Sequence, residues 1–193
     1  GKSTLLSVIS GLERLTSGTV EVDGTAVCGP SDKIGLMPQR DQLFPWRTIR
    51  DNVTLGLSVL GKRTPENLAY ADTLLRRYGL WDFARKRPAQ LSGGMRQRCA
   101  LIRTMATKPK ILLLDEPFSA LDFQTRLSVS SDISRIIRRE GKTAILVTHD
   151  ISEAISLSDR IFVLSARPAV VKNVHDLAKL RGLSPLERRD TEA

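Results

Sequence analysis

The sequence of 193 residues is 41% hydrophobic and 26% charged, which is ordinary for a globular protein and long enough for one domain with a sizeable core. No apolar run approaches the roughly 20 residues that span a bilayer, and the two cysteines lie far apart without metal-ligand spacing. The net charge of +9 allows nucleic acid or anionic lipid as partners, but the basic residues are scattered and no aromatic residues interleave with them. We therefore expect a basic, solvated surface, with membrane proximity as the second interpretation.

The first forty residues are predicted to form a helix, a hairpin and a strand. Residues 3–10 place three aliphatic side chains on one side of a helix that ends at Gly11. In "SGTVEVDGTAV", valines alternate with polar residues and Asp-Gly follows, which is typical of a β-hairpin. The stretch "KIGLMPQ" then predicts a short strand that ends near Gln39.

The middle of the chain, approximately residues 49–107, is predicted to be mostly helical. Glycine and proline residues predict two breaks in it, at 61–65 and at 87–94. This block is longer than a single helix and separates the first strand from the next one. We therefore interpret it as a helical subdomain that is inserted into a larger domain.

Helices and strands alternate in the second half of the chain. "KILLLDEP" and "TAILVTHD" are predicted to be strands buried on both faces, residues 123–140 a helix between them, and "RIFVL" a third strand. Asp150 and Glu153 resemble a capping box that opens a short helix. Beyond Arg167 the pattern weakens, and "SPLERRDTEA" resembles an unfinished segment. The alternation predicts an α/β fold with a mostly parallel sheet, formed by a single domain over residues 1–193.

Two acidic residues follow the buried strand "ILLLDEP". Ligands of open α/β sheets bind beyond the carboxyl ends of the strands, where Asp115 could hold Mg²⁺ and Glu116 could polarise an attacking water. The alternative is that both acids only begin a turn, but four buried aliphatic residues before them favour the functional interpretation.

A second candidate is "LSGGM", just before an amphipathic helix. Ser92 can cap that helix, and Gly93 and Gly94 let an anion approach the unpaired N–H groups at its positive end. An ordinary Ser-Gly-Gly loop is the alternative, which the short spacing to "ILLLDEP" disfavours.

The stretch "LSGGMRQRCALIRTMATKPKILLLDEPFSALD" resembles the signature helix, magnesium strand and following loop of ATP-binding cassette (ABC) ATPases. "VTHD" resembles the switch histidine of that family, and "MPQ" resembles its glutamine loop. The opening "GKST" then resembles the end of the phosphate-binding loop G-x-x-x-x-G-K-[ST]. The resemblance covers essentially the whole chain and implies a P-loop NTPase fold. It also implies that the chain is truncated before Gly1 and at its C-terminal end.

The resemblance assigns the ATP and Mg²⁺ contacts to four short segments. Gly1, Lys2, Ser3 and Thr4 would bind the phosphates, with Lys2 on the β and γ phosphates and Ser3 also on Mg²⁺. Gln39 and Asp115 would complete the metal site, Glu116 would be the general base, and His149 would contact the γ phosphate.

A further group would act on a second subunit. Ser92, Gly93 and Gly94 would contact ATP bound to that subunit, and Asp122 in "SALD" would lie at the same interface. The active unit implied is a head-to-tail dimer with two ATP between its subunits. One departure is Met95, where the family usually has glutamine.

"QLFPWRTIRDNVTLGL" resembles importer ATPases of the nitrate, sulfonate and taurine group. Phe44 and Trp46 would receive the transmembrane permease subunit, or else belong to the local core. The resemblance implies an ATPase that powers solute import at the cytoplasmic face of the membrane, served indirectly by a solute-binding protein. The alternative is a non-transport ABC ATPase acting on nucleic acid or the ribosome. No long coiled coil separates Lys2 from Asp115, so we expect no nucleic-acid partner.

Overall fold

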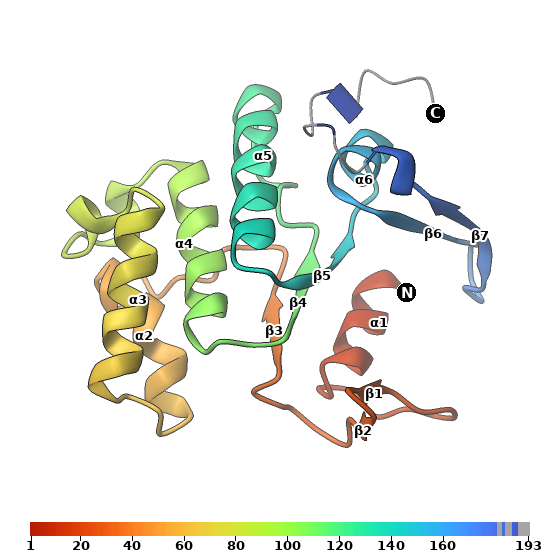
Figure 1. The fold of residues 1–193 in the computed structure, drawn as a ribbon, viewed down its shortest axis with the longest axis horizontal. Coiled ribbons are helices and arrows are strands. Elements are labelled where there is room, and N and C mark those ends of the chain that lie inside the picture. Colours follow the sequence, from red (N-terminus) through yellow and green to blue (C-terminus); the bar gives the residue numbers. More distant parts are fainter. Residues whose placement is uncertain (181–182, 184–186, 189–193) are drawn as a thin grey trace.

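The computed structural model describes residues 1–180, 183 and 187–188, and its centre is a parallel sheet (Figure 1). The sheet has the strand order β3-β4-β5, and both pairs are parallel. Its strands are β3 (Ile34–Met37), β4 (Ile111–Asp115) and β5 (Thr143–Val147). The central strand β4 buries three consecutive leucines, as its apolar run predicts.

The strand β5 is not buried on both faces, which corrects the expectation for "TAILVTHD". Residues 143–145 are exposed, and only Val147 at the end of the strand is buried. The strand β5 is at the edge of the sheet, and only Leu146 and Val147 at its end pack against the two hydrophobic cores, so the side chains at its beginning are left uncovered.

The predicted helical block forms three α-helices and two short 3₁₀-helices. Their bounds are α2 (Ile49–Val59), α3 (Pro65–Arg77), η1 (Trp81–Phe83), η2 (Pro88–Gln90) and α4 (Gly93–Ala106). Thr48 and Thr64 cap α2 and α3 by accepting backbone N–H groups, so both helices begin where a side-chain cap is available. The first predicted break, at 61–65, separates α2 from α3, whereas the second, at 87–94, contains η2 and ends in the first turn of α4. Whether the block is a separate subdomain stays a prediction.

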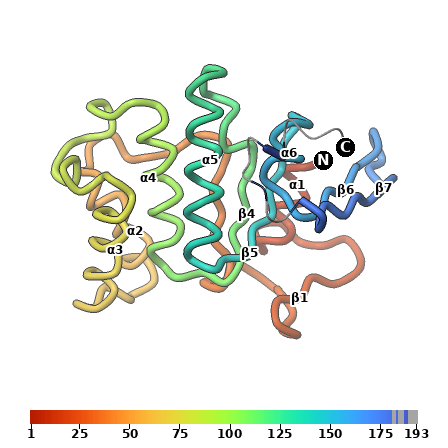
Figure 2. The backbone as a smooth tube through the Cα atoms, turned by 45° about the horizontal axis from the view of Figure 1, so that its top comes forward, coloured from red at the N-terminus to blue at the C-terminus, as the bar shows by residue number. Residues whose placement is uncertain are grey.

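The sheet lies between two helical layers. On one face, Leu112 and Leu114 join a large hydrophobic core that also contains side chains of α2, α3, α4 and α5. On the other face, Leu6 of helix α1 (Lys2–Ile9) packs against Leu113 and Val147. Figures 1 and 2 show α1 on the side of the sheet opposite to α4 and α5. The alternation of Leu112, Leu113 and Leu114 between the two cores follows from the period of two in a strand.

Two helices after β4 connect strands: α5 (Phe123–Arg139) lies between β4 and β5, and α6 (Ile151–Leu157) follows β5. The 3₁₀-helix η3 (Ala178–Leu180) is the last element within the described residues. Asp150 caps α6 as predicted, but Glu153 accepts its hydrogen bond from Thr148 instead of the Asp150 N–H, so only half of the capping box forms. No helix within the described residues is long and apolar enough to cross a bilayer.

Two antiparallel pairs lie outside the central sheet. The predicted hairpin is formed by β1 (Glu21–Val22) and β2 (Thr25–Ala26), whose turn residues Asp23 and Gly24 both have positive φ angles, of 52° and 68°. The predicted third strand, β6 (Arg160–Leu164), pairs with β7 (Val171–Asp176) and does not extend the parallel sheet. The strand β7 was not predicted because all six of its residues are exposed. Apart from 187–188, the segment "SPLERRDTEA" lies outside the described residues.

Candidate functional site

Three predicted site residues meet at the carboxyl edge of the parallel sheet. Gln39 follows β3, Glu116 follows β4 directly, and His149 follows β5. The Gln39 side-chain amide donates a hydrogen bond to Glu116 Oε2 at 3.4 Å, and His149 Nδ1 lies 3.2 Å from Glu116 Oε1. The carboxylate of Glu116 is therefore held between the ends of all three strands, at the edge where ligands of open α/β sheets bind.

The backbone of Glu116 adopts an unusual conformation. Its φ angle is 44°, in the left-handed region that residues other than glycine rarely occupy, and its N–H donates to the Val147 carbonyl at 2.9 Å. Such conformations persist where the surrounding structure holds them, which is frequent at functional sites. The hydrogen bond to β5 fixes where the chain turns after β4, and so it fixes the position of the carboxylate.

Ser119 is a site residue that the sequence analysis missed. Its hydroxyl donates to the Glu116 carbonyl at 3.0 Å and accepts a hydrogen bond from Gln39 Nε2 at 3.3 Å. Serine three residues after a turn is a common local hydrogen-bonding arrangement, so the spacing from Glu116 was an available signal. Ser119 and Glu116 together orient the Gln39 amide.

Asp115 has the features of a metal ligand. One carboxylate oxygen, Oδ1, is buried and has no hydrogen-bond partner among the described residues. A buried carboxylate oxygen without a partner is costly, and a hard cation such as Mg²⁺ would satisfy it. The donor set therefore fits the predicted magnesium site.

The predicted phosphate-binding residues form the start of α1. Gly1 is the N-cap residue and provides no side-chain cap, and no acidic residue lies in the first turn. Ser3 and Thr4 are exposed, and the Lys2 ammonium has no partner within the part of the chain that the structure describes. The unpaired N–H groups and positive end of a helix attract anions. In Figure 1 this end of α1 faces the same side as the carboxyl end of β4.

The signature residues and Asp122 lie at the amino ends of α4 and α5, where Ser92 and Asp122 are the N-cap residues. Ser92 Oγ accepts the Met95 N–H at 3.3 Å. Asp122 accepts the Thr125 N–H at 3.0 Å, and hydrogen bonds from the Thr125 backbone and hydroxyl hold the pKa of Asp122 below its ordinary value. Ser92 and Asp122 are exposed, so their outer sides are accessible to a second molecule.

Phe44 and Trp46 form an exposed aromatic pair. Their ring centroids lie 5.1 Å apart, and Trp46 is 66% exposed whereas Phe44 is 36% exposed. The buried Asn52 anchors the segment, because its side-chain oxygen accepts the Phe44 N–H at 2.7 Å and its amide donates to the Phe44 carbonyl at 3.1 Å. The geometry favours the surface interpretation of Trp46 over the core one.

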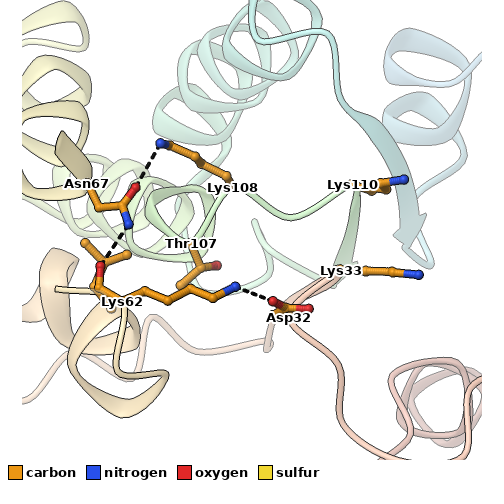
Figure 3. Close-up of a pocket in the computed structure, with 8 residues that line it drawn as sticks. Asp32, Lys33, Lys62, Asn67, Thr107, Lys108 and Lys110 are labelled. Carbon is orange, nitrogen blue, oxygen red and sulfur yellow. Dashed lines mark hydrogen bonds and ion pairs between the residues drawn. The ribbon is translucent and has the colours of Figure 1, made fainter. Parts of the chain in front are cut away.

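A cavity of about 310 Å³ lies elsewhere, between the helical block and the sheet (Figure 3). Lys33 and Lys110 precede β3 and β4, so this cavity is at the amino edge of the sheet, opposite to Glu116. Within it Lys62 forms an ion pair with Asp32, and no predicted site residue lines it.

Comparisons with known proteins show the family of the chain. Residues 1–119 match the family described as ABC transporter. An uncharacterized ABC transporter ATP-binding protein of Bacillus subtilis, YtlC, is 48% identical over 190 residues, which are 98% of this chain and 73% of that protein. The nitrate import ATP-binding protein NrtD of Synechocystis is 44% identical over 172 residues, covering 89% of this chain and 65% of that protein.

A solved structure shows the same fold. It is the dimeric, post-hydrolysis state of the ATP-binding cassette MJ0796 bound to ADP and phosphate. Its TM-score is 0.73 at 33% identity, and the match covers 92% of this chain and 81% of that one. The fold is therefore that of a P-loop NTPase, as predicted. The chain belongs to the ABC transporter family and is an ATP-hydrolysing domain of it.

Proposed function

We propose that this chain is the ATPase subunit that powers a solute importer, and that Glu116 is the centre of its hydrolytic site. The observation that carries the proposal is the convergence of Gln39, Glu116 and His149 from three separate strands. A carboxylate held by two polar side chains at the edge of a parallel sheet is suited to accept a proton from an attacking water. NrtD, a relative with 44% identity, is named as a nitrate import protein.

The nucleotide and its Mg²⁺ would lie between α1 and the Glu116 cluster. Gly1, Lys2, Ser3 and Thr4 bind the phosphates through the amino end of α1. Ser3, Gln39 and Asp115 hold Mg²⁺, which neutralises charge on the phosphates when it is bound. His149 contacts the γ phosphate.

A second copy of the chain would complete each site. Ser92, Gly93, Gly94 and Asp122 lie at the amino ends of α4 and α5, where Ser92 and Asp122 are exposed. We assign them to ATP and to the loop of the partner subunit in a head-to-tail dimer. The matching solved structure is itself dimeric.

The membrane subunit would dock on Phe44 and Trp46. An exposed aromatic pair is uncommon on a surface that has no partner, and aromatic side chains are frequent energetic anchors of interfaces. In this proposal the chain lies at the cytoplasmic face of the membrane, where it would serve a permease and, indirectly, a solute-binding protein. The specificity for a solute lies in those partners.

Histidine variants of the full chain test the proposal, because the sequence contains only two histidines. His149→Ala should lower the ATPase kcat on the order of 10²-fold, the usual cost of removing one group that stabilises a transition state. His175→Ala is the matched control: His175 is exposed on β7, and this variant should keep the wild-type rate. Equal rates in the two variants would refute the assigned site.

A second measurement separates transport from action on nucleic acid. ATP turnover is measured with the membrane subunit in lipid vesicles and, separately, with DNA and RNA. We expect stimulation by the membrane subunit alone. Stimulation by nucleic acid without any response to the membrane subunit would establish the alternative function.

A further inference from the structure

Arg126, in the first turns of α5, contacts two loops at once. Its Nη2 donates a hydrogen bond to the Leu121 carbonyl at 3.2 Å, in the loop that ends with Asp122. Its Nη1 lies 3.6 Å from Asp150 Oδ2, and its Nε lies 3.9 Å from Glu153 Oε1. The guanidinium therefore joins the segment before α5 to the beginning of α6. A planar fork of five donors is well suited to such a bridge.

The two acidic partners of Arg126 also hold the segment that carries His149. Glu153 Oε2 accepts the Thr148 hydroxyl at 2.7 Å, and the same hydroxyl oxygen accepts the Asp150 N–H at 3.0 Å. Asp150 Oδ1 in turn accepts the Glu153 N–H at 3.1 Å. His149 lies between Thr148 and Asp150, and so both of its neighbours are fixed by this network.

The charge of Arg126 matters to this network because Glu153 is partly buried. Burial raises the pKa of the Glu153 carboxyl, whereas the Thr148 hydrogen bond and the positive charge of Arg126 act in the opposite direction. Removing Arg126 would leave a partly buried carboxylate without its cation, which is unfavourable. Loss of this charge would therefore weaken the network that fixes Thr148 and Asp150, and with it the position of the exposed His149 between them.

We propose that Arg126 is a positioning residue that couples the loop ending at Asp122 to the position of His149 against Glu116. This inference rests on the proposed function, in which a partner subunit engages Asp122 and His149 contacts the γ phosphate. When a partner subunit displaces the loop that ends at Asp122, the Leu121 carbonyl moves Arg126, and Arg126 in turn moves the segment that carries His149. Arg126 itself touches neither nucleotide nor reacting atoms.

The test uses the full chain with the variants Arg126→Ala and Arg126→Lys. Arg135→Ala is the matched control, since Arg135 lies on the same helix, its side chain is 75% exposed, and it pairs with the neighbouring Asp132. ATPase kcat and KM, thermal unfolding and the imidazole NMR signals are measured for each. The His149 signal is assigned from its loss in His149→Gln.

We expect Arg126→Ala to lower kcat about tenfold, a usual size for coupling between two sites, while KM changes less than about twofold. Its His149 signal should move, Arg126→Lys should recover part of both effects, and Arg135→Ala should match the wild type. If Arg126→Ala does not fold, Glu153→Gln carries the same test, because it removes the charge and keeps an acceptor for Thr148.

Two results separate failure of the inference from failure of the proposed function. A lower unfolding temperature with unchanged kcat and an unchanged His149 signal would overturn the inference, since Arg126 would then only stabilise the fold. A full-length wild-type protein that does not hydrolyse ATP would overturn the proposed function, while the His149 signal would still decide whether Arg126 positions the histidine.

Discussion

Replacing Gly94 by alanine tests how closely the amino ends of α4 and α5 must pack. A Cβ atom added at Gly94 would lie 2.6 Å from Val129 Cγ2, whereas ordinary contacts begin at 3.4 Å. The helices or the valine must therefore give way by about 0.8 Å. Overpacking of this kind costs about 1–3 kcal/mol, and the higher helix propensity of alanine returns about 1 kcal/mol. We expect a net loss of about 0–2 kcal/mol in the free energy of unfolding.

Urea denaturation of Gly94→Ala, Val129→Ala and the double variant isolates this contact. Because Val129→Ala removes the methyl group that the new Cβ meets, the double variant should lose less stability than the two single variants together. Displacement of α4 should also weaken ATP-dependent dimerisation, since Ser92 begins that helix. A Gly94→Ala protein that is more stable than the wild type by about 1 kcal/mol would refute the close packing and leave helix propensity as the only effect.

Three further predictions follow from the surface and the packing. Replacing both Phe44 and Trp46 by alanine should abolish co-purification with the membrane subunit while ATPase rate and unfolding temperature stay near those of the wild type; a parallel loss of stability would place the pair in the core. Burial opposes ionisation of Glu140, but hydrogen bonds from two tyrosines and an arginine outweigh it and hold its pKa below 4.5. The stabilisation that ionised Glu140 provides is therefore present above pH 4.5 and is lost as the pH falls through its pKa in the folded protein. Glu140→Gln should make the free energy of unfolding fall less steeply with decreasing pH, and an unchanged slope would exclude this role. A thiol reagent should modify the exposed Cys28 in the native protein but spare Cys99, because burial raises the pKa of Cys99 to about 12; rapid reaction of both thiols would disprove that burial.

Much of the fold could be predicted because its signals are local. The Asp-Gly turn and the apolar run of β4 each act within a few residues, and the hairpin and the strand formed at the expected places. The exposure of β5 could not be predicted, because an apolar strand has the same sequence pattern whether it lies in the centre of a sheet or at its edge. The strand β7 was missed for a related reason. It is stabilised by pairing with β6, and the sequence of an exposed strand does not indicate which strand it pairs with.

The candidate site likewise contains contacts that the sequence predicted and contacts that it did not. The meeting of Gln39, Glu116 and His149 follows from parallel strands whose carboxyl ends share one edge, and family motifs marked those positions. The contact of Ser119 with the Glu116 carbonyl is local, and its three-residue spacing was a signal that the sequence analysis did not use. The contacts of Arg126 depend on packing between α5 and α6, which no sequence spacing specifies. The roles of all these residues in catalysis stay predictions.

The most direct test of the central claim is the oligomeric state of Glu116→Gln in the full chain, measured by light scattering with and without Mg-ATP. Glutamine keeps the shape of the side chain but cannot accept a proton from water, so the ATP-bound dimer should accumulate and turnover should nearly cease. Lys2→Ala is the control, and it should remain monomeric in Mg-ATP because the lysine that contacts the phosphates is missing. A Glu116→Gln protein that hydrolyses ATP within a few-fold of the wild-type rate, or that binds ATP and stays monomeric, would contradict the account.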